Sequence, residues 1–135
     1  MKFEYHLISG FVIFILLWIL IPTITITAII VGLVFVVLPD TDLKFKSHRN
    51  FIAHSIIIWV IVFVFNPSVI TLAMIQGIAI HCAFDLKFKR SGMTGFYCIS
   101  FWGYKKMLNG IQSTIWLWCN VIATVLITAW WVLYV

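Results

Sequence analysis

The chain has 135 residues, which is room for one domain, and 64% of them are hydrophobic while only 10% are charged. This balance excludes an ordinary soluble globular protein and indicates an integral membrane protein. Three scattered cysteines, Cys82, Cys98 and Cys119, do not make a disulfide framework. The net charge of +5 would suit a nucleic-acid partner, but in so apolar a chain it is better explained by topology, because cytoplasmic loops retain Lys and Arg.

The first apolar segment follows directly on the amino terminus. Met1-Lys2-Phe3-Glu4 resembles the start of a signal peptide, but no small-residue cleavage site follows, so we expect a retained first helix. As a single helix, residues 7–38 would be about 48 Å long, far more than a ~30 Å hydrocarbon core. Pro22 lacks an N–H group and is therefore the expected break between two shorter helices.

The resulting prediction is an all-α fold, an integral membrane bundle of about five transmembrane helices in one domain, residues 1–135. The helices are expected at about 5–21, 23–38, 51–65, 69–86 and 114–135, with an interfacial loop at 87–113. Uncharged turns at Pro22 and at Asn66-Pro67-Ser68 join them on one side. Aromatic residues at both ends of the last segment, among them Trp116 and Trp131, are typical of a spanning helix.

The charged residues support this count. With five spans, every Lys and Arg falls on one side of the membrane, in the amino terminus and in the segments 39–50 and 87–113. The positive-inside rule makes that side cytoplasmic, so the amino terminus is expected in the cytoplasm and the bundle in the cell (inner) membrane. All four histidines lie in or beside the same segments.

Four short motifs therefore bring His and Asp to one side of the bundle. They are His6 with Gly10 one turn later, Pro39-Asp40-Thr41-Asp42, His48-Arg49 followed by His54-Ser55, and His81-Cys82-Ala83-Phe84-Asp85. His81 and Asp85 are four residues apart, so both lie on one face of a helix and can reach the same ion. Gly77, one turn earlier, would let a neighbouring helix come close. We expect a cup of imidazoles and carboxylates that opens on the cytoplasmic face.

Imidazole and carboxylate together suit zinc, and also manganese or iron. A metal with an open coordination position would activate water for hydrolysis. Arg49, beside His48, has a planar, charged guanidinium group that can bind phosphate through two hydrogen bonds. Simpler interpretations stay open for each motif alone: Asp40 and Asp42 could merely end a helix in a turn, and Arg49 could contact lipid headgroups. Because separate segments deliver His and Asp to one level, we favour a shared metal site.

At these residues the sequence resembles the YdjM-like family of membrane-bound metal-dependent hydrolases. The resemblance covers about residues 6–103 and rests on His6-x3-Gly10, Pro39-Asp40-x-Asp42, His48-Arg49…His54-Ser55 and Gly77-x3-His81-x3-Asp85. That family is similar in its ligand pattern to zinc-dependent phospholipases C and single-strand nucleases, which are helical enzymes that cleave phosphoesters.

The resemblance implies a ligand set. One zinc would be bound by Asp40 (or Asp42), His54, His81 and Asp85, and His6 would help to bind a neighbouring ion bridged by Asp85. The soluble enzymes carry a second His-x3-acid pair after the first, whereas no acidic residue follows Asp85 here. One or two ions are therefore expected, zinc first and manganese as the alternative.

The predicted function is a membrane hydrolase acting on a phosphoester at the cytoplasmic leaflet. Asp40 or Asp42 would hold the metal or accept a proton, and His48 and Arg49 would contact an anionic substrate. A phospholipid or lipid-linked phosphate fits a chain surrounded by membrane lipids best, and nucleic acid is the less favoured substrate. The alternatives are a metal- or proton-binding protein for transport or sensing, and a structural protein whose metal only holds helices together.

Overall fold

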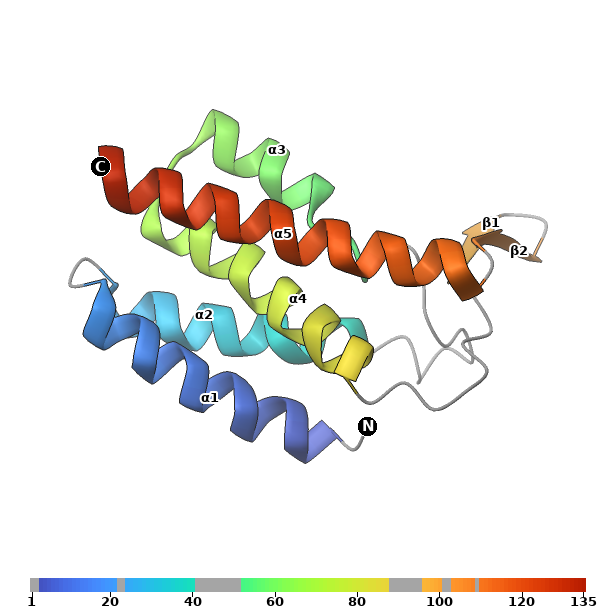
Figure 1. The fold of residues 1–135 in the computed structure, drawn as a ribbon, viewed down its shortest axis with the longest axis horizontal. Coiled ribbons are helices and arrows are strands. Elements are labelled where there is room, and N and C mark those ends of the chain that lie inside the picture. The colour runs from blue at the N-terminus through green and yellow to red at the C-terminus, as the bar shows by residue number, and fades with distance from the viewer. Residues whose placement is uncertain (1–2, 22–23, 41–51, 88–95, 101–102, 109) are drawn as a thin grey trace.

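The computed structural model describes residues 3–21, 24–40, 52–87, 96–100, 103–108 and 110–135 (Figure 1). Within these ranges the chain forms five α-helices, which confirms the predicted number of helices. They are α1 (Phe3–Leu20), α2 (Ile26–Val37), α3 (Ile57–Phe65), α4 (Val69–Lys87) and α5 (Gly110–Tyr134). The predicted break within residues 7–38 is confirmed as well, because α1 and α2 are separate helices.

Local side-chain hydrogen bonds set where two of the helices begin. The hydroxyl of Thr25 accepts a hydrogen bond from the Ala28 N–H at 3.2 Å and caps α2, which therefore starts at Ile26 and not at residue 23. Ser68 plays the same part for α4, since its hydroxyl accepts from the Thr71 N–H at 3.2 Å. These caps satisfy N–H groups that the first turn of a helix leaves without a partner.

Two predicted boundaries were wrong in ways that matter for the site. The third helix was expected from residue 51, but residues 52–54 form a turn and α3 begins only at Ile57. The segment 87–113 was expected to be a loop, but it contains a β-hairpin of β1 (Phe96–Ser100) and β2 (Gly103–Leu108), and α5 already begins at Gly110. The two strands are antiparallel, with Ser100 paired to Gly103 at the turn.

Helix α4 lies at the centre of the bundle and packs against α1, α2, α3 and α5. It belongs to both groups of buried apolar side chains: Leu72 and Ile75 pack towards α3 and α5, and Ala73 and Ile80 pack towards α1 and α2. Its closest neighbour is α2. A Cβ atom added to Gly77 would collide with the Gly32 carbonyl oxygen and lie 2.7 Å from the Cβ of Phe35. The expectation that Gly77 lets a neighbouring helix come close is therefore confirmed.

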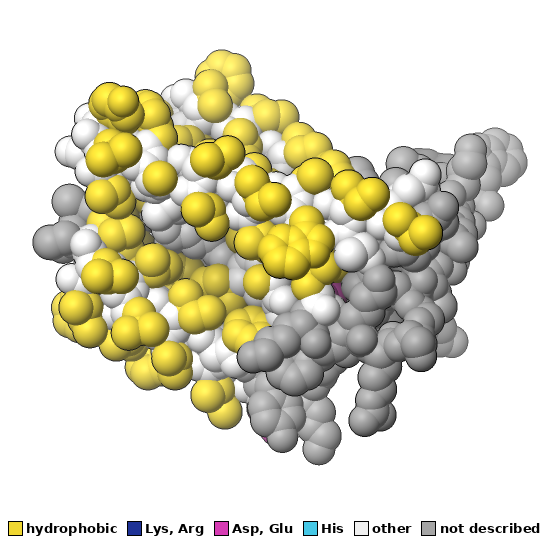
Figure 2. All heavy atoms as spheres, in the orientation of Figure 1, with side chains coloured by type: hydrophobic (Ala, Val, Ile, Leu, Met, Phe, Trp, Pro, Cys, Tyr) yellow, Lys and Arg dark blue, Asp and Glu magenta, His cyan; other side chains and the backbone are white. Residues whose placement is uncertain are grey.

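The outside of the bundle is apolar. Large hydrophobic side chains are exposed on α1, α2, α3 and α5, with Phe65 at 85% and Leu133 at 74% exposure, and Figure 2 shows hydrophobic side chains spread over the described part of one face. Two helices are long and apolar enough to cross a membrane, over Val69–Leu86 and Ile111–Tyr134. Only 22% of the second of these is buried inside the protein, so most of its apolar surface needs another covering.

The described segments that flank the charged parts of the sequence meet at one end of the bundle (Figure 1). The start of α1, the end of α2, the end of α4 and the start of α5 all lie there. The alternating directions of the helices produce this arrangement, because the end of α1, the start of α2, the end of α3 and the start of α4 lie at the opposite end (Figure 1). The carboxyl terminus lies at that opposite end as well.

Candidate metal centre

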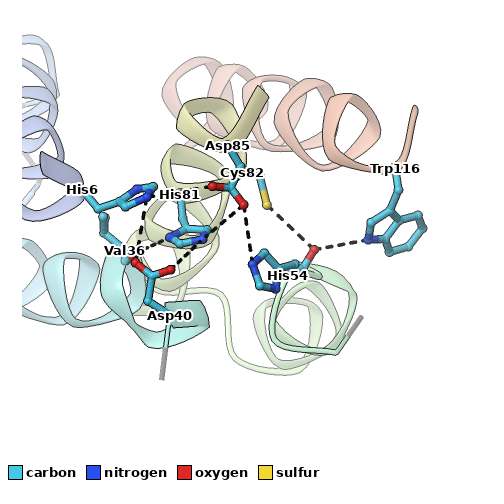
Figure 3. A network of polar contacts seen from close by, with 8 residues as sticks. All are labelled: His6, Val36, Asp40, His54, His81, Cys82, Asp85 and Trp116. Atoms are coloured by element: carbon cyan, nitrogen blue, oxygen red, sulfur yellow. Dashed lines mark hydrogen bonds and ion pairs between the residues drawn. The ribbon is translucent and has the colours of Figure 1, made fainter. Parts of the chain in front are cut away.

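Five side chains from four segments converge at this end of the bundle (Figure 3). His6 comes from the first turn of α1, and Asp40 ends a short 3₁₀ turn that continues α2. His54 lies in the turn before α3. His81 and Asp85 lie on one face of α4, four residues apart. The expectation that these segments place His and Asp at one level is confirmed.

The distances show how closely the five groups approach one another. His6 Nε2 lies 3.9 Å from an Asp40 oxygen and 4.0 Å from an Asp85 oxygen. His81 Nε2 lies 3.9 Å from Asp40 and 3.7 Å from Asp85. His54 Nε2 lies 3.7 Å from Asp85. All five separations are too long for direct hydrogen bonds but bring nitrogen and oxygen lone pairs towards a common centre.

The three imidazole rings pack against one another. The His6 and His81 rings are stacked, with centroids 4.4 Å apart, and the His54 ring meets the His81 ring edge-on at 5.1 Å. The Phe84 ring packs edge-on against the His6 ring, with centroids 6.1 Å apart. All three histidines are almost completely buried, whereas Asp40 and Asp85 keep 13% and 16% of their side chains exposed. The centre is therefore closed on its imidazole side and open on its carboxylate side.

This geometry fits a divalent cation. Ligands about 2.0–2.1 Å from a tetrahedral zinc ion are about 3.4 Å apart, so the observed separations of 3.7 to 4.0 Å would need only small side-chain adjustments. The ligand atoms of His6, His81 and Asp85 all lie within 4.8 Å of one another and could hold a metal ion. Neither ring nitrogen of His6 makes a hydrogen bond within the described residues, although both are buried. Buried polar groups normally have partners, and a cation would supply one.

The hydrogen bond that His81 makes also suits metal binding. Its Nδ1 lies 2.9 Å from the carbonyl oxygen of Val36, which can only accept a hydrogen bond. Nδ1 therefore donates a proton to this carbonyl, and Nε2, which faces the two carboxylates, is the ring nitrogen placed to bind a metal ion. Backbone carbonyls commonly orient metal-binding histidines in this way. The close approach of α2 and α4 at Gly77 is what brings this carbonyl within reach.

The structure brings together all five residues that the sequence suggested as metal ligands: His6, Asp40, His54, His81 and Asp85. Asp42, His48 and Arg49 lie outside the described residues, as do Lys89 and Arg90. The sequence did not reveal the role of the Val36 carbonyl, because a backbone group carries no residue signature. It also suggested only a membrane-interface role for Trp116, whose indole contacts the His54 segment.

No protein family model, curated protein or solved structure matches the chain.

Proposed function

We propose that the chain is a membrane-embedded, metal-dependent hydrolase that cleaves a phosphoester at the cytoplasmic leaflet, as the resemblance to the YdjM-like hydrolases implies. The observation that carries this proposal is the convergence of His6, Asp40, His54, His81 and Asp85 at one end of an apolar bundle. A phospholipid or a lipid-linked phosphate is the favoured substrate, since the centre lies at the end of helices whose outer surfaces suit lipid.

Membrane insertion is supported by the apolar outer surfaces of the helices. Helix α5 is long enough to cross and exposes most of its apolar surface, and α1 and α2 expose apolar side chains of the same kind. Helices α2 and α3, at about 18 Å and about 14 Å, are shorter than a ~30 Å hydrocarbon core and would reach across it only together with the turns that flank them. The positive-inside rule then places the centre and the amino terminus in the cytoplasm.

Two neighbouring metal positions follow from the way the carboxylates are shared. Asp40 directs Oδ2 to His6 and Oδ1 to His81. Asp85 directs Oδ1 to His6 and Oδ2 to both His54 and His81. His6 with the two carboxylates would thus hold one ion, and His54 and His81 with the same carboxylates would hold a second. Zinc suits this donor set best and manganese is the alternative.

When bound, a divalent ion with an open position supplies Lewis-acid activation of water and of the phosphoryl group. The chain's own residues supply the rest. The buried imidazoles would keep water from their side of the centre, and a substrate would approach past the partly exposed carboxylates. Asp40 would hold the metal or accept a proton, with Asp42 as the alternative. His48 and Arg49 follow Asp40 closely in the sequence and would contact the phosphate.

Metal analysis of the purified protein tests the proposal. Detergent-solubilised wild type should contain about one or two zinc or manganese ions per chain, and a His81→Ala/Asp85→Ala double variant should contain none. Cys119→Ser is the matched control, since Cys119 is exposed on α5 and is not among the candidate ligands. A wild type that cannot be loaded with metal would refute the hydrolase and favour a proton-binding network.

Activity then separates an enzyme from a structural metal protein. Loaded wild type should hydrolyse phospholipid or lipid-linked phosphate in mixed micelles. If Asp40 serves the reaction, the Asp40→Asn variant should lose turnover, and its unfolding temperature should change little. A large drop in unfolding temperature together with inactive wild type would indicate a metal that only holds the helices together.

A further inference from the structure

His54 differs from the other imidazoles in the backbone that carries it. His6 and His81 belong to helices, whose backbone hydrogen bonds hold them in place, whereas His54 lies in the turn that precedes α3. Its ring nevertheless reaches the centre, with Nε2 3.7 Å from Asp85. A turn of this kind depends on neighbouring elements for its position, because it lacks the repeated hydrogen bonds of a helix.

Helix α5 supplies that support, although none of its described residues lies among the candidate ligands. The indole N–H of Trp116 donates a hydrogen bond to the His54 carbonyl oxygen at 3.2 Å. The Ile56 N–H donates to the side-chain oxygen of Asn120 at 2.9 Å, and this asparagine is 3% exposed. Two residues of α5 therefore hold the chain on both sides of Ser55.

The supporting residues are themselves fixed. The Asn120 amide nitrogen donates to the Trp116 carbonyl oxygen at 2.8 Å, which orients the amide so that its oxygen faces Ile56. The thiol of Cys82, on α4, lies 3.8 Å from the same His54 carbonyl oxygen that Trp116 contacts. Figure 3 shows the indole and the thiol meeting at this oxygen while the imidazole ring of His54 points towards Asp85.

We infer that Trp116 and Asn120 are positioning residues that hold His54 in the metal centre. The inference rests on the proposed metal site. Only the His54 side chain separates this supported backbone from the metal position, so a shift of the turn moves the imidazole by a similar amount. Groups that orient metal ligands from outside the ligand shell typically change metal affinity by about 10- to 100-fold. Helix α5 thus determines whether His54 reaches the metal position, although α5 itself contributes no candidate ligand.

Cobalt(II) binding to the full-length protein in detergent tests this inference, because the visible spectrum of cobalt reports the number and kind of its ligands. Trp116→Phe removes the N–H donor and keeps an aromatic ring. Its cobalt affinity should fall by about tenfold, and its spectrum should move towards that of His54→Ala. Trp118→Phe is the matched control, since Trp118 is on the same helix but 52% exposed, and it should behave as the wild type.

A second pair of variants repeats the test at Asn120. Asn120→Leu removes the acceptor of the Ile56 N–H and should shift the cobalt spectrum in the same direction as Trp116→Phe. Thr124→Val is its control, since that hydroxyl bonds within α5, to the Asn120 carbonyl oxygen. A wild-type spectrum in both Trp116→Phe and Asn120→Leu would overturn the positioning role and leave the metal centre standing. A wild type that binds no cobalt would overturn the centre itself, and the positioning role with it.

Discussion

Asp85 connects the three imidazoles of the candidate centre. One of its oxygens faces His6 at 4.0 Å, and the other faces both His54 and His81 at 3.7 Å. Asp40 approaches only His6 and His81, each at 3.9 Å. Loss of the Asp85 charge would therefore remove a partner from all three imidazoles, whereas loss of the Asp40 charge would affect only two.

The two carboxylates can be ranked by how much each contributes to the metal affinity of the protein. Asp85→Asn should weaken zinc binding by at least about tenfold, the lower end of what even outer-shell groups contribute. Asp40→Asn should weaken it less, because Asp40 faces one imidazole fewer. Competition with a chromophoric chelator measures both affinities. Equal affinities in the wild type and Asp85→Asn would contradict the assignment of Asp85 as the shared ligand.

The pairing of α2 with α4 is the element-level contact on which the site depends. The absence of a side chain at Gly77 lets the two backbones approach, and this approach places the Val36 carbonyl oxygen 2.9 Å from His81 Nδ1. The same pairing carries Asp40, just beyond the end of α2, to the carboxyl end of α4. Packing between helices, and not the helices themselves, therefore determines the orientation of His81.

A methyl group at Gly77 tests this pairing. In Gly77→Ala the added Cβ would meet the Gly32 carbonyl oxygen and Phe35, both of which include backbone atoms that cannot turn aside. We expect the free energy of unfolding to fall by about 1–3 kcal/mol, and metal affinity to fall as well. Denaturant titration of the detergent-solubilised protein measures the first quantity and chelator competition the second.

Gly10→Ala is the control for that experiment. Its added Cβ would meet only the side chain of Val36, at 3.0 Å and beyond, so the structure can adjust at lower cost. A loss at Gly10→Ala as large as that at Gly77→Ala would show that the α2–α4 approach has no special role.

At the scale of the whole molecule, the centre joins elements that are otherwise connected by apolar packing. The segments carrying His6, Asp40 and His54 each reach α4 at the same end of the bundle. Buried imidazoles and carboxylates are costly without a compensating charge. A bound ion would therefore stabilise the folded bundle as well as serve the reaction.

Metal removal should for this reason lower the unfolding temperature. Ligand linkage predicts a stabilisation of about 2.7 kcal/mol when free metal is at 100 times its dissociation constant. Scanning fluorimetry with and without chelator measures the shift, and added zinc should restore it. His81→Ala/Asp85→Ala should not respond to chelator, and a response equal to that of the wild type would place the metal elsewhere.

The arrangement of the helices also predicts the topology. The proposed five passes would put the amino terminus in the cytoplasm and Val135 on the other side, and the start of α1 and the end of α5 lie at opposite ends of the bundle (Figure 1). A green fluorescent protein fused after Val135 should stay dark and a periplasmic alkaline phosphatase should be active there. The reverse pattern would contradict the five-pass topology.

The apolar segments, the break within residues 7–38 and the close approach at Gly77 were all predictable from the sequence, because they follow from local hydrophobicity and from the geometry of Pro and Gly. The pairing of His81 with Asp85 was predictable for the same reason, since a four-residue spacing fixes their shared face.

Only the tertiary structure decided how His54 reaches the centre and what orients His81. An apolar run at residues 51–65 indicated a helix, yet its first residues form a turn whose position depends on Trp116 and Asn120 in a distant part of the sequence. The carbonyl of Val36 acts through its backbone, which leaves no mark in the residue type. Contacts between helices depend on packing, and local patterns do not specify which backbone group or indole will meet a given histidine.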